Sequence, residues 1–595
     1  MCAIHGFCWP SEEKINEMLC EAHHRGPDGS DKWISDDITL GHNLLSIVDT
    51  VENGKQPFYY EDLILVYNGE IYNYKELQKT LKTSCKTDTD TEVLIRGIKE
   101  HGKEFVYKLD GMFAFACYNK TTKELILARD TNGTKPLYYG YIKDKLYFSS
   151  EIKSLLECGF ERKVCKKAFG LYYNQGYVPG YLSMFEGIKK LVPGQVLVNG
   201  QSHNLLNYDL QAPTNLDPDH VGKQIQLKLN YSVKQTLMGR RNIGLFLSGG
   251  LDSTSILYEM KELGVKPRTF TSSFATTDPQ SRLNEDSKLA QKLCKDWGIE
   301  NNMVYQTQID YVDSLEDTFY ALEEPRQGKS FPTYYNMNKF MSSNDITVTL
   351  AGDGGDELFA GYKHHLWPQW SNQLKRLREH SRELNNSDYK CSLDDQIEYL
   401  NEWLPTQQIK HDYLNDFLYI ESLNTLAEDY LVRNDKLGMA HSMEGRFPIL
   451  NKRLRDYVRA IPSELKTHEE FEKYPKGKHK YLQKKAYKGL LPNYILNHHK
   501  TGWRFPTDEI LIGRREQPAP DKGILKDYII EILKDKELQD LFEYNDLDIH
   551  KKYLNNKEFQ DERIKPKKPI GLYAQKELFV ILNFAVWKKV FKVQL

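Results

Sequence analysis

The stretch LFLSGGLDSTS, residues 245–255, decides the fold of the larger part of this chain. A short apolar run ends at Ser248, two glycines follow, and a helix is predicted to begin near Asp252. Glycine lets the backbone approach a ligand closely, and the free amides at a helix start form a site for anions. The Lys-Ser/Thr pair of a Walker loop is missing, so a different phosphate loop is indicated. An ordinary capped corner between a strand and a helix is the alternative for this motif taken alone.

A second glycine-rich and acidic turn follows another apolar run, at AGDGGDELFAGY, residues 351–362. Ligands of a parallel sheet bind beyond the carboxyl ends of its strands, so both turns could face one pocket. Asp252 and Asp356 would then supply carboxylates for a magnesium ion on the same phosphates. A capped helix start, where acidic residues are favoured anyway, is again the alternative. Two such turns after two strands favour a nucleotide site.

Strands alternate with helices around these turns. The apolar runs at 243–248, 268–274 and 345–352 are predicted strands, and helices are predicted after each, the last from about Glu357. This alternation predicts an α/β domain with a parallel sheet. The segment from 365 to the end is predicted to be mainly helical.

The residues up to about 205 have a different pattern, in which short strands and turns are interrupted by helical stretches near 73–82 and 91–101. This pattern predicts a β-rich α+β domain. The segment 200–219 is polar and rich in turns, as a linker would be. We therefore predict two domains, 2–205 and 215–595. The predicted strands of the first are 63–68, 112–118, 123–129 and 145–150.

The composition excludes several classes of protein. The chain has 595 residues, of which 40% are hydrophobic and 28% charged, and its formal net charge is -2. Large cores are possible, but the charge gives no sign of a nucleic-acid partner. No apolar run is long enough to cross a membrane, and the first residues lack the features of a signal peptide. The nine cysteines are scattered without metal-binding spacing, which predicts reduced thiols in a cytoplasmic protein.

Cys2 is a candidate nucleophile, because a small residue at position 2 permits removal of the initiator Met. Its thiolate could attack a carbonyl, and its own α-amine, with a pKa near about 8, could act as the general base. A cysteine at this position usually has no such role. Five motifs downstream change that expectation: HRGPDG (24–29), LSIVD (45–49), NGEIYN (68–73), TDTEV (89–93) and RDTNGTKPLYYG (129–140).

In this order the motifs resemble the class II glutamine amidotransferases, which are N-terminal nucleophile hydrolases with an αββα fold. The resemblance runs from residue 2 to about 195. It implies that Cys2 attacks the glutamine amide to release ammonia, that Asn68 and Gly69 form the oxyanion hole, and that Asp90 pairs with the glutamine α-amine. The implied glutamine-binding residues are Leu44, Leu45, Ser46, Ile47, Val48, Asn68, Gly69, Glu70 and Asp90.

The remainder of the chain, from about 220, resembles the asparagine synthetase family. SGGLDS is similar to the pyrophosphate loop of the N-type ATP pyrophosphatases, and GDGGDELFAGY narrows the resemblance to asparagine synthetases. The segments 431–451 and 498–506 are similar to the family's acceptor pocket and late lysine motif. They imply catalytic roles for Asp353 and Lys500. The implied ATP-binding residues are Leu247, Ser248, Gly249, Gly250, Asp252, Ser253, Ser272, Ala351 and Gly352, and the implied metal ligands are Asp252 and Asp356.

The resemblance implies a ligase that uses ATP and Mg2+. Aspartate would be activated as an acyl-adenylate, and ammonia from glutamine would cross between the domains, shielded from water, to give asparagine. The expected partners are aspartate, glutamine and ATP, with no nucleic acid and no membrane; a homodimer stays open. Two alternatives remain: a relative that acts on another carboxylate, and a nucleotide-sensing or scaffold protein on the same fold.

Three departures from the family pattern affect particular assignments. Leu44 stands where the family has the Arg that clamps the glutamine α-carboxylate. Asn451 stands in PILN where the family reads PFLD, and EEPRQGKSFPTY (323–334) is about one residue short. The last two departures lie where the acceptor would be recognised.

We predict weak glutamine use, or a different carboxylate clamp through His42 or Asn43. A charge-assisted hydrogen bond contributes roughly 1.5–3 kcal/mol, which is about 10- to 100-fold in affinity. The measurement compares glutamine with ammonium as nitrogen donor. A low glutamine KM that is unchanged in His42 and Asn43 variants would contradict both options.

Overall fold

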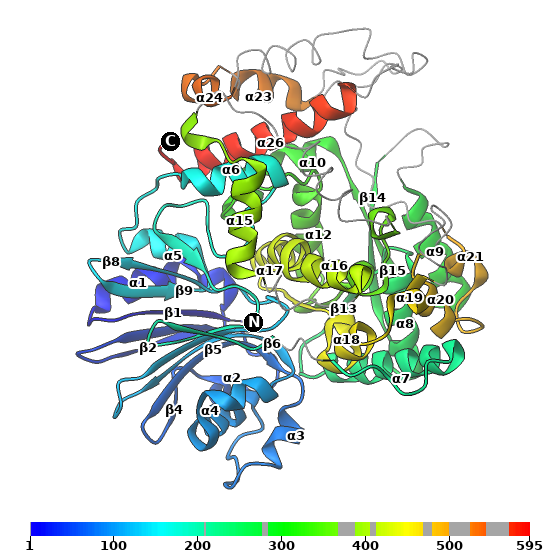
Figure 1. Cartoon of the computed structure of the whole chain (residues 1–595), viewed down its shortest axis with the longest axis horizontal. Helices are drawn as coiled ribbons and strands as arrows, with labels where there is room; N and C mark the ends of the chain where they lie inside the picture. Colours follow the sequence, from blue (N-terminus) through cyan, green and yellow to red (C-terminus); the bar gives the residue numbers. More distant parts are fainter. Residues whose placement is uncertain are drawn as a thin grey trace.

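The computed structural model describes residues 2–206, 210–275, 284–366, 387–404, 412–467, 479–498, 524–532, 534–542 and 570–595. They form an amino-terminal domain built on β-sheets and a carboxy-terminal domain with helices around one sheet, packed side by side (Figure 1). The first domain ends with β12 (Gln201–Asn204), and the second begins with α7 (Pro218–Thr236). The predicted linker therefore starts too early, because residues 201–204 complete a sheet.

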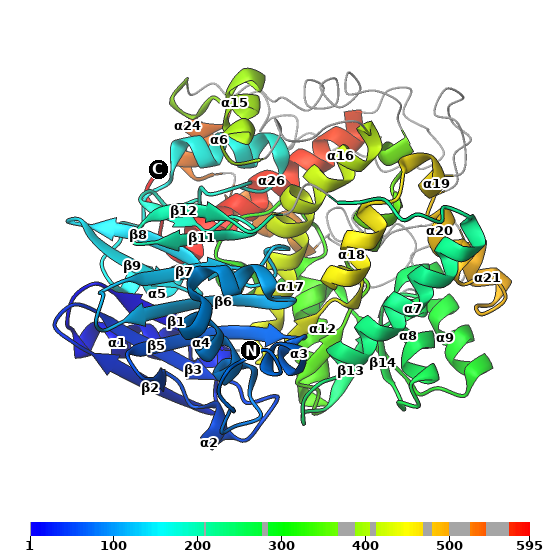
Figure 2. The same ribbon diagram turned by 60° about the horizontal axis from the view of Figure 1, so that its bottom comes forward.

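Two antiparallel six-stranded sheets stack face to face in the amino-terminal domain (Figure 2). In spatial order the first sheet is β10 (Ile188–Lys190), β8 (Tyr138–Ile142), β9 (Lys145–Ser149), β1 (Ala3–Phe7), β3 (Thr39–Leu44) and β2 (Gly29–Ile34). The second is β12, β11 (Gln195–Val198), β7 (Leu125–Arg129), β6 (Gly111–Asn119), β5 (Leu63–Ile71) and β4 (Phe58–Tyr60). Apolar side chains from both inner faces, among them Ile4, Leu40, Val66 and Leu127, form the core between the sheets.

Helices cover the outer faces of both sheets, which confirms the αββα architecture. The first sheet carries α1 (Glu12–Glu21) and α5 (Ile152–Glu157), and the second carries α4 (Asp90–His101) with α3 (Tyr74–Gln78) beside it. The helix α3 is shorter than predicted, because Thr80 N–H bonds back three residues to Leu77 O and tightens the turn.

Five parallel strands form the sheet of the carboxy-terminal domain, as predicted. Their spatial order is β15 (Asn301–Gln306), β14 (Arg268–Phe274), β13 (Ile243–Phe246), β16 (Val348–Leu350) and β17 (Glu444–Arg446). The chain runs outward from β13 to β15 and then returns to the other side of β13. The direction of winding therefore reverses between β13 and β16, and the ligand crevice of such a sheet lies at the carboxyl ends of those two strands.

Helices pack on both faces of this sheet. One group is α7, α8 (Leu251–Glu262) and α9 (Glu285–Trp297), and the other is α12 (Phe331–Ser343) and α17 (Val432–Met439). The helix predicted from about Glu357 is only α13 (Gly355–Phe359), because Ala360 adopts a left-handed conformation at φ 56° and ends it. Further helices are α10 (Gln308–Asp313), α11 (Leu315–Leu322), α15 (Leu393–Trp403), α16 (Tyr413–Glu421), α18 (Lys452–Arg459) and α20 (Tyr481–Ala486).

The last helix, α26 (Ile570–Phe591), returns to the boundary between the domains and packs against α11 and against α6 (Lys166–Gln175) (Figure 1). Trp587 Nε1 donates to Glu323 O over 2.7 Å. The Glu323 carboxylate in turn accepts from the main-chain N–H of Lys153 at 2.8 Å, at the start of α5 in the other domain. Glu323 thus links the last helix of the chain to the amino-terminal domain.

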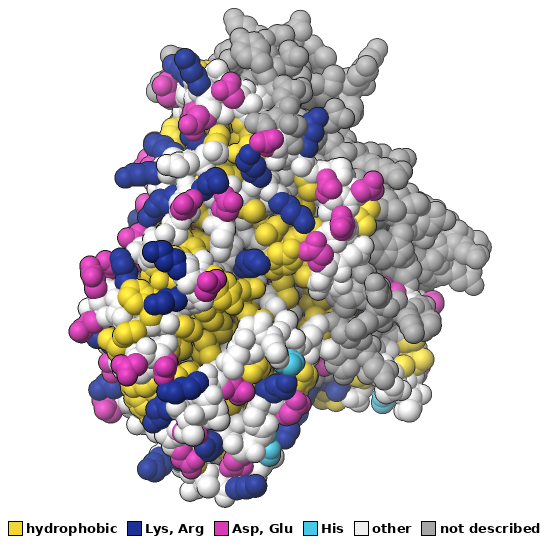
Figure 3. All heavy atoms as spheres, turned by 60° about the vertical axis from the view of Figure 1, so that its left-hand side comes forward, with side chains coloured by type: hydrophobic (Ala, Val, Ile, Leu, Met, Phe, Trp, Pro, Cys, Tyr) yellow, Lys and Arg dark blue, Asp and Glu magenta, His cyan; other side chains and the backbone are white. Residues whose placement is uncertain are grey.

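Basic and acidic side chains are interspersed on the face shown in Figure 3, with apolar patches between them. None of the helices in the described part of the chain has the length and apolar character that a membrane crossing requires.

Candidate functional site

The two glycine-rich turns of the carboxy-terminal domain meet at the crevice between β13 and β16. Gly249 has φ 78°, and a Cβ there would lie 2.5 Å from the Asp286 carbonyl oxygen. A Cβ on Gly352, in the turn after β16, would lie 2.8 Å from the Cβ of Asp252. Both positions exclude a side chain. The turns that we predicted to face one pocket therefore lie in direct contact.

A buried lysine lies between the two turns. Lys480 contacts Asp252 Oδ2 through its Nζ, which also lies 2.8 Å from Asp356 Oδ1. Burial opposes the charge of Lys480, but the two carboxylates outweigh it and hold its pKa above the ordinary value. Asp252 Oδ1 is buried without a hydrogen-bond partner among the described residues. Converging carboxylates with an unsatisfied oxygen are a donor set that fits Mg2+.

The other predicted nucleotide-binding residues lie in or beside the same turns. Ser248 Oγ lies 3.1 Å from Ser253 Oγ and accepts from Gly250 N–H at 3.2 Å. Ser272 Oγ, on β14, accepts from Gln306 Nε2 at 2.8 Å. Main-chain amides and hydroxyls are thus concentrated at the start of α8, as an anion site requires. Leu247, Ala351 and Gly352 directly follow β13 and β16.

Asp353 lies in the acidic turn and faces α17. Its Oδ1 is 3.5 Å from Arg433 Nη2, and the Arg433 guanidinium lies 5.1 Å from the ring centre of Tyr334. Burial raises the pKa of Asp353, and the Arg433 charge opposes that shift. The predicted Lys500 lies outside the described residues.

Cys2 directly precedes β1 and has an unsatisfied hydrogen-bond donor beside it. Its main-chain N–H donates to Asn68 Oδ1 over 2.9 Å, while Asn68 Nδ2 is buried with no hydrogen-bond partner in the described part of the chain. Gly69 has no room for a Cβ, because the Met112 carbonyl oxygen fills the space. Burial raises the pKa of the Cys2 thiol to about 11, so a neighbouring base is needed for reaction near neutral pH. One hydrogen bond thus joins the main chain of Cys2 to the side-chain amide of Asn68.

Buried carboxylates surround this cysteine. Asp90 Oδ2 accepts from Tyr67 OH at 2.8 Å and from Ile71 N–H at 2.9 Å. Burial raises the pKa of Asp90 and, more strongly, that of Glu70. Glu70 Oε1 lies 3.3 Å from Arg446 Nη2 of β17, so the other domain supplies its counter-charge.

The predicted glutamine-binding segment is held from both domains. Ser46 N–H donates to Asp28 Oδ2 at 2.8 Å, and Ser46 O accepts from Arg241 Nε at 2.8 Å. Arg240 N–H donates to Ile47 O over 2.8 Å. The loop between α7 and β13 therefore holds Ser46 and Ile47, which Leu45 and Val48 flank in the sequence.

No cation replaces the missing arginine at the positions that we predicted. Leu44 is a buried residue at the end of β3. His42 Nε2 lies 3.1 Å from Tyr67 O, and burial lowers the pKa of His42 to about 3, which leaves it neutral. Asn43 Nδ2 donates to Leu19 O over 3.0 Å. The geometry does not support a clamp through either side chain.

Comparison with known proteins decides the family. Residues 1–208 match the glutamine amidotransferase domain, and residues 224–587 match asparagine synthase. The chain belongs to the asparagine synthase family. "Asparagine synthetase [glutamine-hydrolyzing] 1" of Bacillus subtilis (strain 168) is 30% identical, over 88% of this chain and 90% of the relative.

Two further relatives of this asparagine synthase family member carry different names. "Putative asparagine synthetase [glutamine-hydrolyzing] 2" of Methanocaldococcus jannaschii is 32% identical, over 62% of this chain and 76% of the relative. "Amidase chry2" of Gibberella zeae is 25% identical, over 83% of this chain and 85% of the relative. The names thus include an amidase beside the asparagine synthetases.

Some residues of this asparagine synthase site were missed by sequence reasoning. Lys480 stands in the lysine-rich stretch KGKHK, where no local pattern distinguishes it from surface lysines. Arg241 precedes β13 and resembles an ordinary turn residue. Arg25 and Asp435 lie in two quoted motifs, but they are 410 positions apart and their pairing has no local signal.

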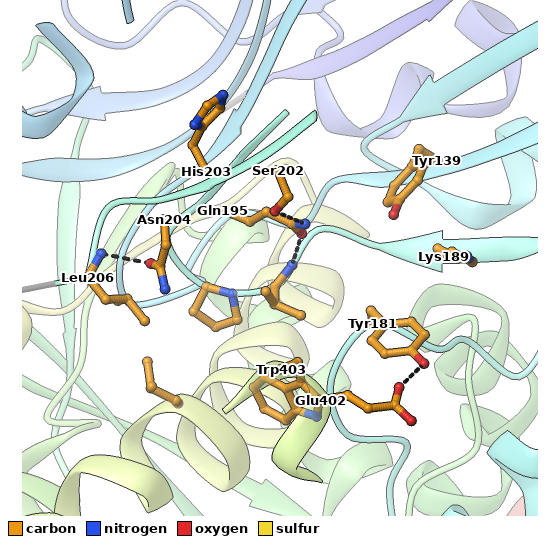
Figure 4. Close-up of a pocket in the computed structure, with 13 residues that line it drawn as sticks. Tyr139, Tyr181, Lys189, Gln195, Ser202, His203, Asn204, Leu206, Glu402 and Trp403 are labelled. Carbon is orange, nitrogen blue, oxygen red and sulfur yellow. Dashed lines mark hydrogen bonds between the residues drawn. The ribbon is translucent and has the colours of Figure 1, made fainter. Parts of the chain in front are cut away.

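A cavity of about 340 Å³ lies away from both predicted sites, between the strands β10–β12 and the end of α15 (Figure 4). Tyr181 OH donates to Glu402 Oε2 at 2.5 Å, and Gln195 Nε2 donates to Ser202 Oγ at 3.0 Å. These four lining side chains pair with one another, and no predicted site residue of the asparagine synthase chain borders the cavity.

We predict that the amidotransferase domain loses stability as the pH falls below about 6.5. Burial lowers the pKa of His42 to about 3 and that of His5 to about 4. In this range the unfolded chain binds protons that the folded domain excludes, so stability rises with pH. His42→Gln should flatten the dependence of the thermal unfolding midpoint on pH between about 4 and 7, whereas His203→Gln, on the edge strand β12, should not. Equal slopes in wild type and His42→Gln would contradict this assignment.

Proposed function

We propose that the chain makes L-asparagine from L-aspartate with ATP, using glutamine or ammonia as nitrogen donor, through a β-aspartyl-AMP intermediate. The products would be asparagine, AMP and pyrophosphate, with glutamate when glutamine is the donor. The observation that carries the proposal is the contact between the two glycine-rich turns at the crevice of the parallel sheet. Membership of the asparagine synthase family supports it.

At the amidotransferase site, removal of Met1 would turn the Cys2 nitrogen into an α-amine. That amine would accept the thiol proton, since the thiol pKa of about 11 is too high for spontaneous ionisation near neutral pH. The thiolate would attack the glutamine amide carbon, and the oxyanion would be stabilised by Asn68 Nδ2 and Gly69 N–H. Ammonia would leave with the transferred proton, and water would release glutamate from the thioester.

At the synthetase site, the hydroxyls and amides of Ser248, Gly249, Gly250 and Ser253 would bind the pyrophosphate part of ATP. Asp252 and Asp356 would hold Mg2+, which when bound neutralises phosphate charge. Lys480 Nζ occupies the space between these carboxylates, so it would pair with phosphate instead when nucleotide enters. Asp353 would orient the adenylate, and Lys500 would stabilise its developing charge. Leu247, Ser272, Ala351 and Gly352 would contact the adenosine.

A different acceptor carboxylate is the alternative, and the structure accounts for one of the departures that suggested it. Asn451 Nδ2 donates to Asp110 Oδ2 at 2.9 Å, and Asn451 Oδ1 accepts from Arg453 N–H at 3.1 Å. Asn451 therefore caps α18 and pairs with an acid of the other domain, where a second acid would repel Asp110. The contact with Asp110 accounts for an amide at position 451, so Asn451 is no argument for a different acceptor carboxylate. A cytoplasmic location and a homodimer remain predictions.

The decisive experiment follows asparagine and AMP after incubation with ATP, Mg2+, aspartate and either glutamine or ammonium. Cys2→Ala should abolish the glutamine-dependent reaction and preserve the ammonium-dependent one. Asp252→Asn should lower both by about 100-fold or more, because it removes a carboxylate from the phosphate site. The matched control is Asp219→Asn, which removes an exposed acid from the first turn of α7.

Two outcomes would contradict the proposal. AMP release with another carboxylic acid but not with aspartate would favour the alternative acceptor. Undiminished activity in Asp252→Asn would exclude the nucleotide site assigned here.

A further inference from the structure

The helix α17 of the asparagine synthase domain contacts both predicted sites. Arg433 lies 3.5 Å from Asp353 in the acidic turn. Two residues further along the helix, Asp435 points to the amino-terminal domain and accepts from Arg25 Nη1 at 2.8 Å and from Nη2 at 3.2 Å. Residues two apart on a helix face different directions, so this helix can address two sites at once.

Arg25 is the link from this helix to the nucleophile. Its Nε donates to the Cys2 carbonyl oxygen over 3.1 Å. The ladder between β1 and β3 begins at Ala3, paired with Asn43, so Cys2 lies just outside it. In the described part of the chain, the main chain of Cys2 is held by two hydrogen bonds, from Arg25 to its carbonyl and from its N–H to Asn68. Arg25 therefore makes one of these two main-chain hydrogen bonds, while the thiol itself donates to Leu45 O at 4.0 Å.

The position of Arg25 depends on Asp435. Arg25 is fully buried, and its other carboxylate contact is a single hydrogen bond of 2.9 Å to Glu151 Oε1. Burial disfavours the guanidinium charge, but Asp435 and Glu151 outweigh that effect and raise the pKa of Arg25. A bidentate carboxylate also fixes the plane of the guanidinium, which one hydrogen bond does not. Lys135 Nζ, 3.7 Å from Asp435 Oδ1, would lose the same counter-charge.

Further contacts hold α17 against the glutamine-binding segment. Met439, in its last turn, packs with Leu45 and Ile47 in one apolar cluster. Ser442 Oγ, just beyond the helix, donates to His24 O at 2.7 Å. The carboxyl-terminal end of the helix, beyond Asp435, is therefore also fixed against the amidotransferase domain.

We propose that Asp435 is a positioning residue for Cys2, acting through Arg25, so that a residue of the synthetase domain completes the glutaminase site. No proton moves in this role: Asp435 holds the guanidinium, and the guanidinium holds the Cys2 carbonyl, which fixes the main chain that carries the thiol. The inference rests on the proposed function, because it assumes that Cys2 is the nucleophile. The inference goes beyond the proposed function because it makes glutamine hydrolysis depend on the docking of α17 against the amidotransferase domain.

The test compares Asp435→Asn and Arg25→Lys with the matched control Glu428→Gln. Glu428 also pairs across the boundary, 3.1 Å from Arg129 Nη1 and 3.0 Å from Lys190 Nζ, but none of these groups contacts Cys2. Asp435→Asn should lower the kcat of glutamine hydrolysis by about 10- to 100-fold with a KM within about threefold. Glu428→Gln should change it by less than about threefold, and ammonium-dependent synthesis should stay within about threefold in all variants.

A second readout does not depend on catalysis. The rate of Cys2 alkylation by iodoacetamide, resolved by peptide mass mapping, should change by about threefold or more in Asp435→Asn and stay unchanged in Glu428→Gln. Asp435→Asn and Arg25→Lys act through the same contact. The double variant Arg25→Lys/Asp435→Asn should therefore lose no more glutaminase activity than the more impaired of the two single variants. If Asp435→Asn fails to fold, Arg25→Lys retains the buried cation and tests the Cys2 contact alone.

The proposal is overturned if Asp435→Asn or the folded Arg25→Lys retains wild-type kcat and alkylation rate, if Glu428→Gln loses as much, or if the losses multiply in the double variant. Failure of the proposed function would look different: wild type would release no glutamate from glutamine. The alkylation rates would still decide whether Asp435 positions Cys2.

Discussion

Charged side chains buried at the boundary between the two domains are the constraint on which both sites depend. Arg25 pairs with Asp435, and Arg129 pairs with Glu428, with almost no exposure of any of the four side chains. Breaking such a pair leaves an uncompensated buried charge, which costs roughly 3–5 kcal/mol. Each pair therefore stabilises the same register of docking. That register also places Arg25, which donates to the Cys2 carbonyl, against α17, the helix whose Arg433 lies beside the acidic turn of the other domain.

The crevice of the carboxy-terminal domain is shaped by a different, purely steric constraint. The turns after β13 and β16 touch because Gly352 and Gly355 carry no Cβ, and a Cβ at either position would collide with Asp252. Close contact brings Asp252 and Asp356 together, and two carboxylates need a cation between them. Lys480 supplies that cation in the protein itself. The buried lysine thus offsets the repulsion between the two carboxylates.

The departures from the family pattern have different consequences. At Asn451, the amide that replaces a carboxylate is matched by Asp110 across the boundary, so the change is local and compensated. At Leu44, no described side chain at the predicted positions restores the lost charge, because His42 is neutral and the amide of Asn43 already donates to Leu19. Instead, Arg241 holds the main chain of the predicted glutamine-binding segment through a hydrogen bond to Ser46 O. The main chain of this segment is therefore held in place, although neither His42 nor Asn43 supplies a charge for the glutamine α-carboxylate.

The sequence by itself determined a β-rich α+β domain, a parallel-sheet domain, and the turns at 248–250 and 352–356, because these follow from apolar periods and glycine patterns within a few residues of each other. The αββα arrangement of the first domain was implied by the resemblance to the class II glutamine amidotransferases. The sequence also singled out Cys2 and Asn68 through their motifs. It predicted a helix from about Glu357 but not its early end at Ala360, because the left-handed conformation of Ala360 has no clear local signal. Only the tertiary structure decided that Lys480 lies between Asp252 and Asp356, and that Asp435 holds Arg25 behind Cys2. Such pairings join residues hundreds of positions apart, and they are set by how buried charges find partners when the domains dock, which no local pattern in the chain encodes.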